Sequence, residues 1–316
     1  MHDPSYPSMK EITVFPQTTK LAAVAFLCLI VVLPALSQGK LDTVQIRTQK
    51  VGEGIFMLTG AGGNIGVSSG PDGIFLIDDQ FAPLTEKITK AVAEATQSNA
   101  PVRFVLNTHW HGDHTGGNEN MGVAGAVIVA QENVRKRMSV EQFNEMFNRK
   151  TPASPANALP IVTFEDELTF YLNGDEIRAF HVKNAHTDGD VIVHFKKANV
   201  LHMGDVFFSG TYPIIDISSG GSIDGMISAL TRVLPFVNEG TRIIPGHGPL
   251  SRKYDLKVYR EMLTGVRVLM QRQIAEKKTL DQVKAANPLR DYDARWAKGS
   301  VKPEQFLEMV YKSLRK

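Results

Sequence analysis

Four side chains that can bind a metal lie close together in the segment Thr108-His109-Trp110-His111-Gly112-Asp113-His114. Zinc binds imidazole nitrogen and carboxylate oxygen at about 2 Å. In an extended loop, His109 and His111 point to one side while Asp113 and His114 point to the other. One short loop would therefore serve two adjacent metal ions. A polar surface loop with incidental histidines is the alternative, but three of the nine histidines lie here beside an aspartate, which favours metal binding.

Three further candidate ligands follow predicted strands later in the chain. His186 lies in Ala185-His186-Thr187-Asp188-Gly189, Asp205 in Met203-Gly204-Asp205, and His247 in Pro245-Gly246-His247-Gly248-Pro249. The neighbouring glycines let the backbone approach a metal without a Cβ clash. Singly, these residues have ordinary interpretations as a loop histidine, a helix cap and a turn residue. Because all three follow strands in a chain that also carries the histidine-rich loop, we expect them to join it.

Short strands and helices must bring these residues together. In the first half, β-branched and aromatic residues between Gly-rich turns predict strands, and helical spacing of apolar residues predicts helices. The predicted strands are Val44–Arg47, Gly54–Leu58, Ile65–Ser68, Ile74–Asp78, Arg103–Leu106 and Ala126–Val129. The predicted helices are 83–96 and Gln131–Phe147. Three prolines make Thr151–Pro160 an irregular loop.

The second half is likewise predicted to contain both strands and helices. Asn173-Gly174 is typical of a hairpin turn. The predicted strands are Leu168–Leu172, Glu176–Val182, Val191–Phe195, Val200–Met203 and Arg242–Ile244. The predicted helices are Ile223–Val237 and Tyr254–Glu276, with further helical material to the C-terminus. No repeat or linker follows residue 40, so residues 38–316 are predicted to form a single catalytic domain.

The composition favours a small-molecule substrate over nucleic acid. The chain has 316 residues, of which 43% are hydrophobic and 22% charged, and this is typical of a globular protein with a sizeable core. The 35 basic and 33 acidic residues are spread through the sequence and leave a net charge of +2. A basic face for nucleic acid is therefore not expected.

The N-terminal sequence predicts export. Residues 21–36, LAAVAFLCLIVVLPAL, are uncharged and almost wholly apolar, and Ala35-Leu36-Ser37 offers small residues for cleavage. We expect a signal peptide over residues 1–37 and a secreted or periplasmic protein. The run is short for a membrane span of roughly 20 residues, and an uncleaved membrane anchor is the alternative. The single cysteine, Cys28, lies in this run, so the mature protein would lack a thiol nucleophile and disulfides.

These motifs resemble those of the metallo-β-lactamase superfamily, in the order its members use, from about Val44 to Leu269. The resemblance implies an α/β fold of four layers, an αββα sandwich with two mixed sheets and the site along one edge, which agrees with two strand groups flanked by helices. It also implies two zinc ions: His109, His111 and His186 hold one, Asp113, His114 and His247 hold the second, and Asp205 bridges both.

A dinuclear zinc hydrolase follows from this ligand set. Two zinc ions lower the pKa of a shared water toward neutrality and polarise a carbonyl, so we expect a metal-bound hydroxide to cleave a β-lactam amide, a lactone or a thioester. Asp113 is the predicted catalytic residue, because it would orient the nucleophile and pass a proton to the leaving group. Tyr212 is a candidate substrate-binding residue, with ordinary loop packing as the alternative. His202, three residues before Asp205, is interpreted as structural and as a candidate support for the metal ligands.

The substrate stays open between branches of the family. The sequence around His186-Thr187-Asp188 resembles secreted β-lactamases, whereas the all-His/Asp ligand set resembles the glyoxalase II and lactonase branches. Asp205 stands where one β-lactamase subclass has cysteine and another has serine. Phe208 stands where the first of these has a lysine that pairs with the antibiotic's carboxylate, and an apolar residue cannot replace that charge.

Two alternatives to this hydrolase differ in class. One is a non-catalytic, exported metal-binding or partner-binding protein of the same fold, which the complete set of seven competent ligands disfavours. The other is an iron or mixed-metal redox enzyme, since carboxylate-rich sites also accept iron. Such relatives usually carry a flavin domain, for which the residues after 287 leave no room. The sequence does not indicate the oligomeric state.

Overall fold

Seven strands pair into one mixed sheet in the first half of the chain. The computed structural model describes residues 41–145 and 148–315, and the predicted signal peptide over residues 1–37 lies outside them. The spatial order is β1-β2-β3-β4-β5-β6-β9, antiparallel from β1 to β4 and parallel from β4 to β9. The strands are β1 (Arg47–Gly52), β2 (Ile55–Thr59), β3 (Ile65–Gly70), β4 (Gly73–Ile77), β5 (Val102–Asn107), β6 (Val127–Gln131) and β9 (Val162–Phe164).

A second sheet of five strands follows, in the order β10-β11-β12-β13-β14. Its strands are β10 (Glu167–Leu172), β11 (Asp175–His181), β12 (Val191–Phe195), β13 (Val200–His202) and β14 (Arg242–Ile244). The predicted hairpin turn is confirmed, since Asn173 (φ 55°) and Gly174 (φ 71°) both have positive φ. Asn173 also links the sheets, because its side-chain amide donates to Ser68 Oγ at 3.0 Å and its backbone N–H donates to Asp72. The pairing of β13 with β14 is parallel, so both strands end at the same edge.

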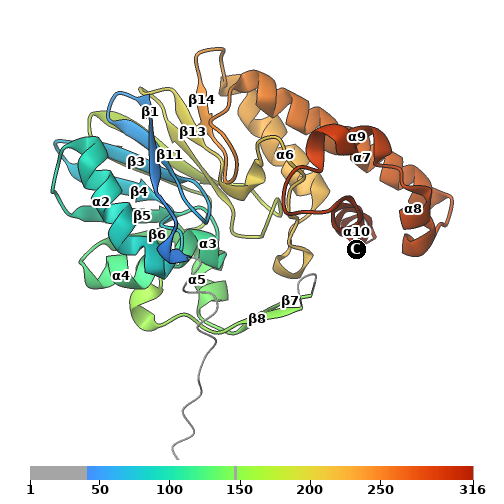
Figure 1. The fold of residues 1–316 in the computed structure, drawn as a ribbon, viewed down its shortest axis with the longest axis horizontal. Helices are drawn as coiled ribbons and strands as arrows, with labels where there is room; N and C mark the ends of the chain where they lie inside the picture. Colours follow the sequence, from blue (N-terminus) through green and yellow to red (C-terminus); the bar gives the residue numbers. More distant parts are fainter. Residues whose placement is uncertain (1–40, 146–147, 316) are drawn as a thin grey trace, which may run out of the picture. The chain divides into compact units, whose positions relative to one another are not determined.

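Three layers of apolar side chains hold the sheets and helices together. Figure 1 shows how these sheets and helices are arranged. In β4, Ile74 and Leu76 pack with α2 (Thr85–Thr96), while Phe75 and Ile77 face the second sheet. Both faces of this strand are covered, which explains its continuous apolar run. The outer face of the second sheet packs against α6 (Ile223–Val233) and α7 (Lys253–Ala275). The resulting order of helix, sheet, sheet and helix confirms the predicted αββα sandwich.

Helix α6 begins at a side-chain cap. Ser222 caps α6 by accepting the N–H of Gly225 at 3.0 Å, and the apolar residues of α6 recur at helical spacing toward the core. The remaining helices are α3 (Gly112–Thr115), α4 (Asn118–Val123), α5 (Glu132–Met138), α8 (Leu280–Ala286), α9 (Arg290–Trp296) and α10 (Pro303–Ser313). Short 3₁₀ turns are η1 (Ala82–Leu84), η2 (Ala156–Ala158), η3 (Gly204–Val206), η4 (Ile217–Ser219) and η5 (Leu234–Phe236).

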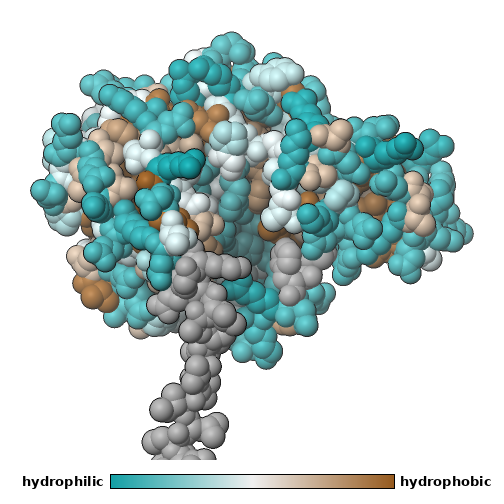
Figure 2. Space-filling view, viewed as in Figure 1, coloured by the Kyte–Doolittle hydropathy of each residue, from teal (hydrophilic) through white to brown (hydrophobic). Residues whose placement is uncertain are grey.

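The described residues belong to one compact unit. Figure 2 shows one face of it covered largely by hydrophilic residues, with hydrophobic residues in small groups. Among the described residues, no helix combines the length and the apolar character needed to cross a membrane.

Two sequence predictions need correction. The helix predicted over Gln131–Phe147 ends at Met138, because the hydroxyl of Ser139 and the side-chain amide of Gln142 donate to carbonyls of its last turn. The chain then forms a hairpin of β7 (Gln142–Asn144) and β8 (Arg149–Thr151). The first strand is β1 rather than Val44–Arg47: the edge strand is largely exposed and lacks the apolar alternation of a half-buried strand.

Candidate metal centre

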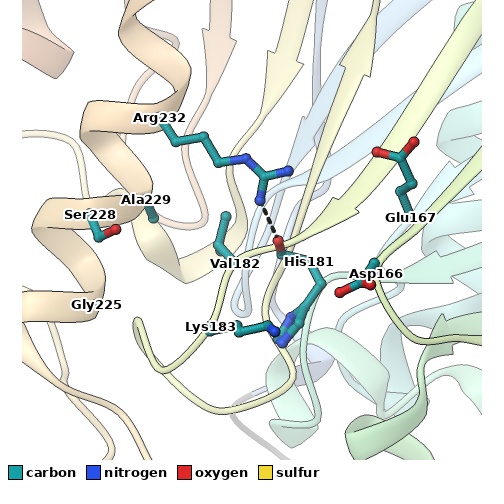
Figure 3. A pocket seen from close by; sticks show the side chains of 9 residues that line it. All are labelled: Asp166, Glu167, His181, Val182, Lys183, Gly225, Ser228, Ala229 and Arg232. Atoms are coloured by element: carbon teal, nitrogen blue, oxygen red, sulfur yellow. Dashed lines mark hydrogen bonds between the residues drawn. The ribbon is translucent and has the colours of Figure 1, made fainter.

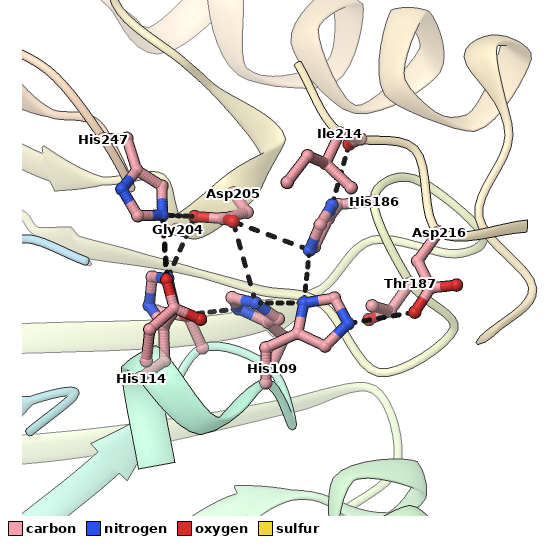
Figure 4. A network of polar contacts seen from close by, with 12 residues as sticks. His109, His114, His186, Thr187, Gly204, Asp205, Ile214, Asp216 and His247 are labelled. Atoms are coloured by element: carbon pink, nitrogen blue, oxygen red, sulfur yellow. Dashed lines mark hydrogen bonds and ion pairs between the residues drawn. The ribbon is translucent and has the colours of Figure 1, made fainter. Parts of the chain in front are cut away.

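The seven predicted ligands gather at one edge of the two sheets, each beyond the end of a strand. Figure 4 labels five of them, His109, His114, His186, Asp205 and His247. β5 of the first sheet ends at Asn107, and its continuation carries His109 and His111 before α3 begins at Gly112. Asp113 and His114 therefore lie in the first turn of α3. The second sheet supplies the other three ligands: His186 from the β11–β12 connection, Asp205 after β13 and His247 after β14.

The first group of ligands consists of three histidines and one carboxylate. His111 Nδ1 lies 3.1 Å from His109 Nε2 and 2.9 Å from His186 Nε2. Asp205 Oδ2 faces them at 3.8 Å from His109 Nε2 and 3.6 Å from His186 Nε2. His109, His186 and Asp205 are almost completely buried. We call His109, His111 and His186 the three-histidine group.

The second group contains Asp113, His114 and His247. His247 Nε2 lies 3.3 Å from Asp113 Oδ2 and 3.4 Å from His114 Nε2. The other oxygen of Asp205, Oδ1, is 3.1 Å from His114 Nε2 and 3.4 Å from His247 Nε2. Asp205 thus faces the three-histidine group with one oxygen and the second group with the other. The structure brings all seven predicted residues together.

Hydrogen bonds on the outer side of two imidazoles fix their tautomers. Thr108 donates its backbone N–H to Asp78 Oδ1 at 2.7 Å and its hydroxyl to Asp78 Oδ2 at 2.8 Å. The hydroxyl oxygen of Thr108 in turn accepts a hydrogen bond from Nδ1 of His109 at 3.1 Å. Asp78 Oδ2 accepts one from Nδ1 of His114 at 2.7 Å. Both histidines therefore carry a proton on Nδ1 and point Nε2 toward the cluster.

The other two members of the three-histidine group are held in the same manner. His111 Nε2 donates to Asp216 Oδ2 at 2.9 Å, and His186 Nδ1 donates to the carbonyl of Ile214 at 2.9 Å. Asp216 is itself fixed by the hydroxyl of Ser219 at 2.7 Å. With their outer nitrogens engaged in this way, the three imidazoles each turn their other ring nitrogen toward one place, an arrangement that a cation stabilises.

This donor set fits bound metal. Besides the converging ring nitrogens, Asp205 Oδ1 is buried and forms no hydrogen bond within the described residues, although it faces His114 and His247. Buried carboxylate oxygens are normally hydrogen-bonded or bound to a cation. Imidazole nitrogens and carboxylate oxygens are also the ligands that zinc and related divalent ions take in proteins.

The pKa values differ between the two groups. Burial lowers the pKa of His186 to about 4 and holds that of His109 well below its usual value. Burial also opposes protonation of His247, but the carboxylates of Asp205 and Asp113 raise its pKa to about 9. His109 and His186 are therefore neutral at neutral pH, whereas a metal ion that binds His247 would displace a proton from it.

Two glycines let the ligands approach the backbone. A Cβ on Gly63 would lie 2.1 Å from Cε1 of His114, and a Cβ on Gly246 would lie 2.1 Å from Oδ1 of Asp205. Asn64, next to Gly63, donates its side-chain amide to the carbonyls of Pro245 and Gly248 at 2.9 Å each and so holds the loop that carries His247.

His202 contacts the backbone next to the candidate ligands, at Asn64 and Gly204. Its Nε2 is 3.0 Å from the carbonyl of Asn64, and its Nδ1 accepts the N–H of Gly204 at 3.3 Å. It is fully buried and is not one of the residues grouped around the metal position. Its contacts agree with the predicted structural and supporting role.

Other side chains near the motifs are used in packing. The ring of Phe208 stacks on that of His247 with centroids 5.2 Å apart. Trp110 is buried, and its Nε1 donates to Ser219 Oγ at 3.1 Å. The hydroxyl of Tyr212 donates to Asp293 Oδ1 at 2.9 Å, and its buried ring packs in the helical core. The structure thus gives Tyr212 another partner than a substrate, and the predicted substrate contact stays a prediction.

A separate hollow of about 320 Å³ contains none of the seven ligands (Figure 3). Acidic Asp166 and Glu167 line one part of it, and Lys183 and Arg232 line another. Arg232 donates to the carbonyl of His181 at 2.8 Å across this hollow. The mixed charges do not select one class of ligand.

Sequence reasoning missed Asp78 and Asp216, the two carboxylates that orient His114 and His111. Asp78 carries a detectable signal, because burying a carboxylate directly after strand β4 costs free energy unless the carboxylate has a hydrogen-bonded or charged partner. Asp216 carries none: it lies in an irregular segment, 105 residues from His111.

Comparison with known proteins agrees with this geometry. A family model described as the metallo-beta-lactamase superfamily matches residues 61–257, which include all seven ligands but not α8, α9 or α10. A lactamase-like protein of Pestalotiopsis microspora is 23% identical over 280 residues, covering 88% of this chain and 75% of that protein. The hydroxyacylglutathione hydrolase of Maricaulis maris is 26% identical over 235 residues, covering 68% and 80% respectively.

Solved structures show the same fold. A metallo-beta-lactamase from Pontibacter korlensis superimposes with a TM-score of 0.56 and 20% identity, covering 70% of this chain and 99% of that one. The DIM-1 metallo-beta-lactamase gives a TM-score of 0.56 and 22% identity, again covering 70% and 99%.

Proposed function

Because this chain belongs to the metallo-β-lactamase superfamily, whose members include hydrolases, we propose that it is a dinuclear zinc hydrolase of a small carbonyl substrate. The observation that carries the proposal is the division of the Asp205 carboxylate, with Oδ2 facing the three-histidine group and Oδ1 facing Asp113, His114 and His247. A carboxylate in this position would bridge two cations and reduce their mutual repulsion.

The residues of the chain would divide the work as follows. His109, His111 and His186 would hold one zinc ion, Asp113, His114 and His247 the other, and Asp205 both. Two such ions supply the positive charge that lowers the pKa of water and polarises a carbonyl.

Asp113 is the residue best placed to handle protons. Its side chain is 30% exposed, whereas that of Asp205 is 4% exposed. Burial alone would raise the pKa of Asp113, but the neighbouring His114 and His247 lower it well below its usual value. The carboxylate is therefore ionised at neutral pH. It would accept a proton from the attacking water and deliver it to the leaving group.

The proposed substrates are a β-lactam amide, a lactone and a thioester, which share a carbonyl carbon open to attack by water. The name of the Maricaulis maris relative, a hydroxyacylglutathione hydrolase, supports a thioester, and the name of the Pestalotiopsis microspora relative supports a lactam. Phe208 packs flat on His247 and brings an apolar ring beside this ligand. A substrate without a carboxylate at that position fits this surface best.

Metal analysis followed by a substrate panel tests the proposal. Purified protein is expected to hold two zinc ions per chain, to lose them and its activity to a chelator, and to recover both when zinc is added back. The panel would contain a cephalosporin, a carbapenem, a homoserine lactone and a thioester. Activity confined to the lactone or thioester would remove the antibiotic substrates, and metal binding without turnover of any of the four would favour the non-catalytic alternative.

We also propose that the enzyme is exported, on the basis of residues 21–36, which lie outside the described residues. Fractionation of producing cells and mass analysis of the N-terminus of the purified protein test this. A mature chain that begins near residue 38 supports a cleaved signal. A full-length chain in the membrane fraction supports the anchor, and a full-length chain in the cytosol contradicts export.

A further inference from the structure

Two histidines of the three-histidine group depend on one segment, residues 211–222. Within it, the carbonyl of Ile214 accepts from His186 Nδ1, and the carboxylate of Asp216 accepts from His111 Nε2, both at 2.9 Å. The backbone N–H of Asp216 also donates to the carbonyl of His186 at 2.9 Å. The position of this segment therefore sets the orientation of both imidazoles.

Other ligands are oriented from elsewhere. His109 is held by Thr108, and His114 by Asp78, both of which lie at the ends of strands in the first sheet. Movement of residues 211–222 would therefore disturb the three-histidine group and leave the outer hydrogen bond of His114 intact. This difference makes the two groups experimentally separable.

The 211–222 segment contains no regular structure except η4, and the C-terminal helices hold its first part. The backbone N–H of Tyr212 donates to the carbonyl of Trp296 at 2.9 Å, and the hydroxyl of Tyr212 donates to Asp293 Oδ1 at 2.9 Å. The ring of Tyr212 stacks on Phe306 with centroids 4.5 Å apart. Tyr212 is thus fixed to α9 and α10 through its backbone, its ring and its hydroxyl.

Contacts farther along the segment go to the same helices. The N–H of Ile215 lies 3.2 Å from the Met309 sulfur, a weak acceptor. The residue after the segment, Ile223, donates its N–H to Ser313 Oγ at 3.0 Å. A Cβ on Gly299 would lie 2.9 Å from Cβ of Thr211, so this part of the chain is closely packed as well.

We propose that Tyr212 is a positioning residue through which α9 and α10 control how tightly the three-histidine group holds its metal ion. Tyr212 is two residues from Ile214 and four from Asp216, so a shift of its ring would be passed along the backbone to both acceptors. Partners of metal-ligating histidines typically change metal affinity 10- to 100-fold when they are removed. The inference rests on the proposed function, because it requires bound metal, and it places part of the control of the site in helices beyond the residues that the family model matches.

Tyr212→Phe tests the proposal because it removes only the hydroxyl that donates to Asp293. Tyr311→Phe is the matched control: Tyr311 is also buried and lies on α10, but its hydroxyl donates to the carbonyl of Lys278 at 2.8 Å. The affinities of the full chain for its two zinc ions would be measured by competition with a coloured chelator. Asp216→Asn and His247→Ala serve as references: the first disturbs His111 of the three-histidine group, and the second removes one of the three residues of the second group.

Tyr212→Phe is expected to weaken the binding of the same zinc ion that Asp216→Asn weakens. The expected loss is about tenfold, the lower end of the range for direct partners of ligating histidines, because Tyr212 acts on them only through Ile214 and Asp216. In Tyr212→Phe, the zinc affinity that His247→Ala weakens should stay within about twofold of wild type. Both zinc affinities of Tyr311→Phe should also stay within about twofold of wild type. Asp293→Ala removes the acceptor from the partly exposed side of the contact. Asp293→Ala should show the same selective loss of zinc affinity as Tyr212→Phe. If Tyr212→Phe fails to fold, Asp293→Ala takes its place in the test.

Three outcomes would overturn the inference. Tyr212→Phe and Asp293→Ala could keep the wild-type affinity for both zinc ions, or they could lose affinity for both ions equally. The third outcome is a loss of zinc affinity no greater than that of Tyr311→Phe. Each of these leaves the proposed function standing if wild-type protein binds two zinc ions. Wild-type protein that binds no metal would end the proposed function itself, and the positioning role with it.

Discussion

Asp78 and His114 are 36 residues apart in the chain, yet Asp78 Oδ2 lies 2.7 Å from His114 Nδ1 and both side chains are fully buried. The same carboxylate also accepts two hydrogen bonds from Thr108. One residue at the end of β4 thus orients a ligand and fixes the start of the histidine-rich loop.

Asp78→Asn should weaken metal binding about 10- to 100-fold, because Asp78 holds His114 directly and holds His109 through Thr108. The backbone at Asp78 has φ 65°, which asparagine tolerates, but the amide nitrogen cannot accept a hydrogen bond. Zinc content and affinity by competition titration check this. Asp72→Asn, an exposed turn position, is the control and should bind metal as wild type does. Equal affinities in the two variants would contradict the role of Asp78.

Gly63→Ala should displace His114 and lower metal content. Its new Cβ would stand 2.1 Å from the imidazole, well inside van der Waals contact, and the ring is fully buried. Gly112→Ala is the control within the histidine-rich loop, because a Cβ there has no heavy atom within 4 Å. Elemental analysis of both purified variants compares them. Normal zinc in Gly63→Ala would mean that the loop relaxes without cost to His114.

Asp113→Ala should reduce turnover by about 10²- to 10⁴-fold, the contribution of a positioned acid–base group. The predicted cause is the loss of the carboxylate that handles protons beside His247. The variant's kcat and zinc content are measured together on the substrate identified by the panel. Full kcat with normal zinc content would exclude Asp113 as the catalytic residue.

Glu308→Gln should lower stability by about 1 kcal/mol at neutral pH and less in acid. The hydrogen bond from Lys284, together with that from Lys312, lowers the pKa of Glu308 below its usual 4.5, and its side chain is only 23% exposed. A lowered folded-state pKa stabilises the protein above pH 4.5 and loses that effect as the pH falls through the folded-state pKa. Urea unfolding at pH 7 and below pH 4 compares the variant with wild type and with Glu261→Gln, an exposed position on α7. A deficit that stays constant with pH would argue against this ion pair.

The gathering of the seven candidate ligands could be predicted because each combines a metal-binding side chain with a position beyond the end of a buried strand. His109, Asp205 and His247 all follow strands whose apolar residues are recognisable in the sequence, and parallel pairing of β13 with β14 brings the last two to one edge. The layers could be predicted for the same reason, since β4 and the first three residues of β12 are continuous apolar runs.

Residues that depend on tertiary contacts could not be predicted. Asp216 lies in an irregular segment whose position is set by α9 and α10, so neither its spacing nor its neighbours indicate His111 as its partner. The end of α5 depends on the side chains of Ser139 and Gln142, while local helical spacing continues past it. Edge strand β1 has few buried residues, and its register depends on pairing with β2.

The division of the ligands between the two sheets has a mechanical consequence. His109, His111, Asp113 and His114 follow a strand of the first sheet, whereas Asp205 and His247 follow strands of the second. Ions shared by these residues would be non-covalent cross-links between the halves of the sandwich. Removing them should speed amide hydrogen exchange first along this seam, while the end of the sandwich that Asn173 ties to Ser68 stays protected.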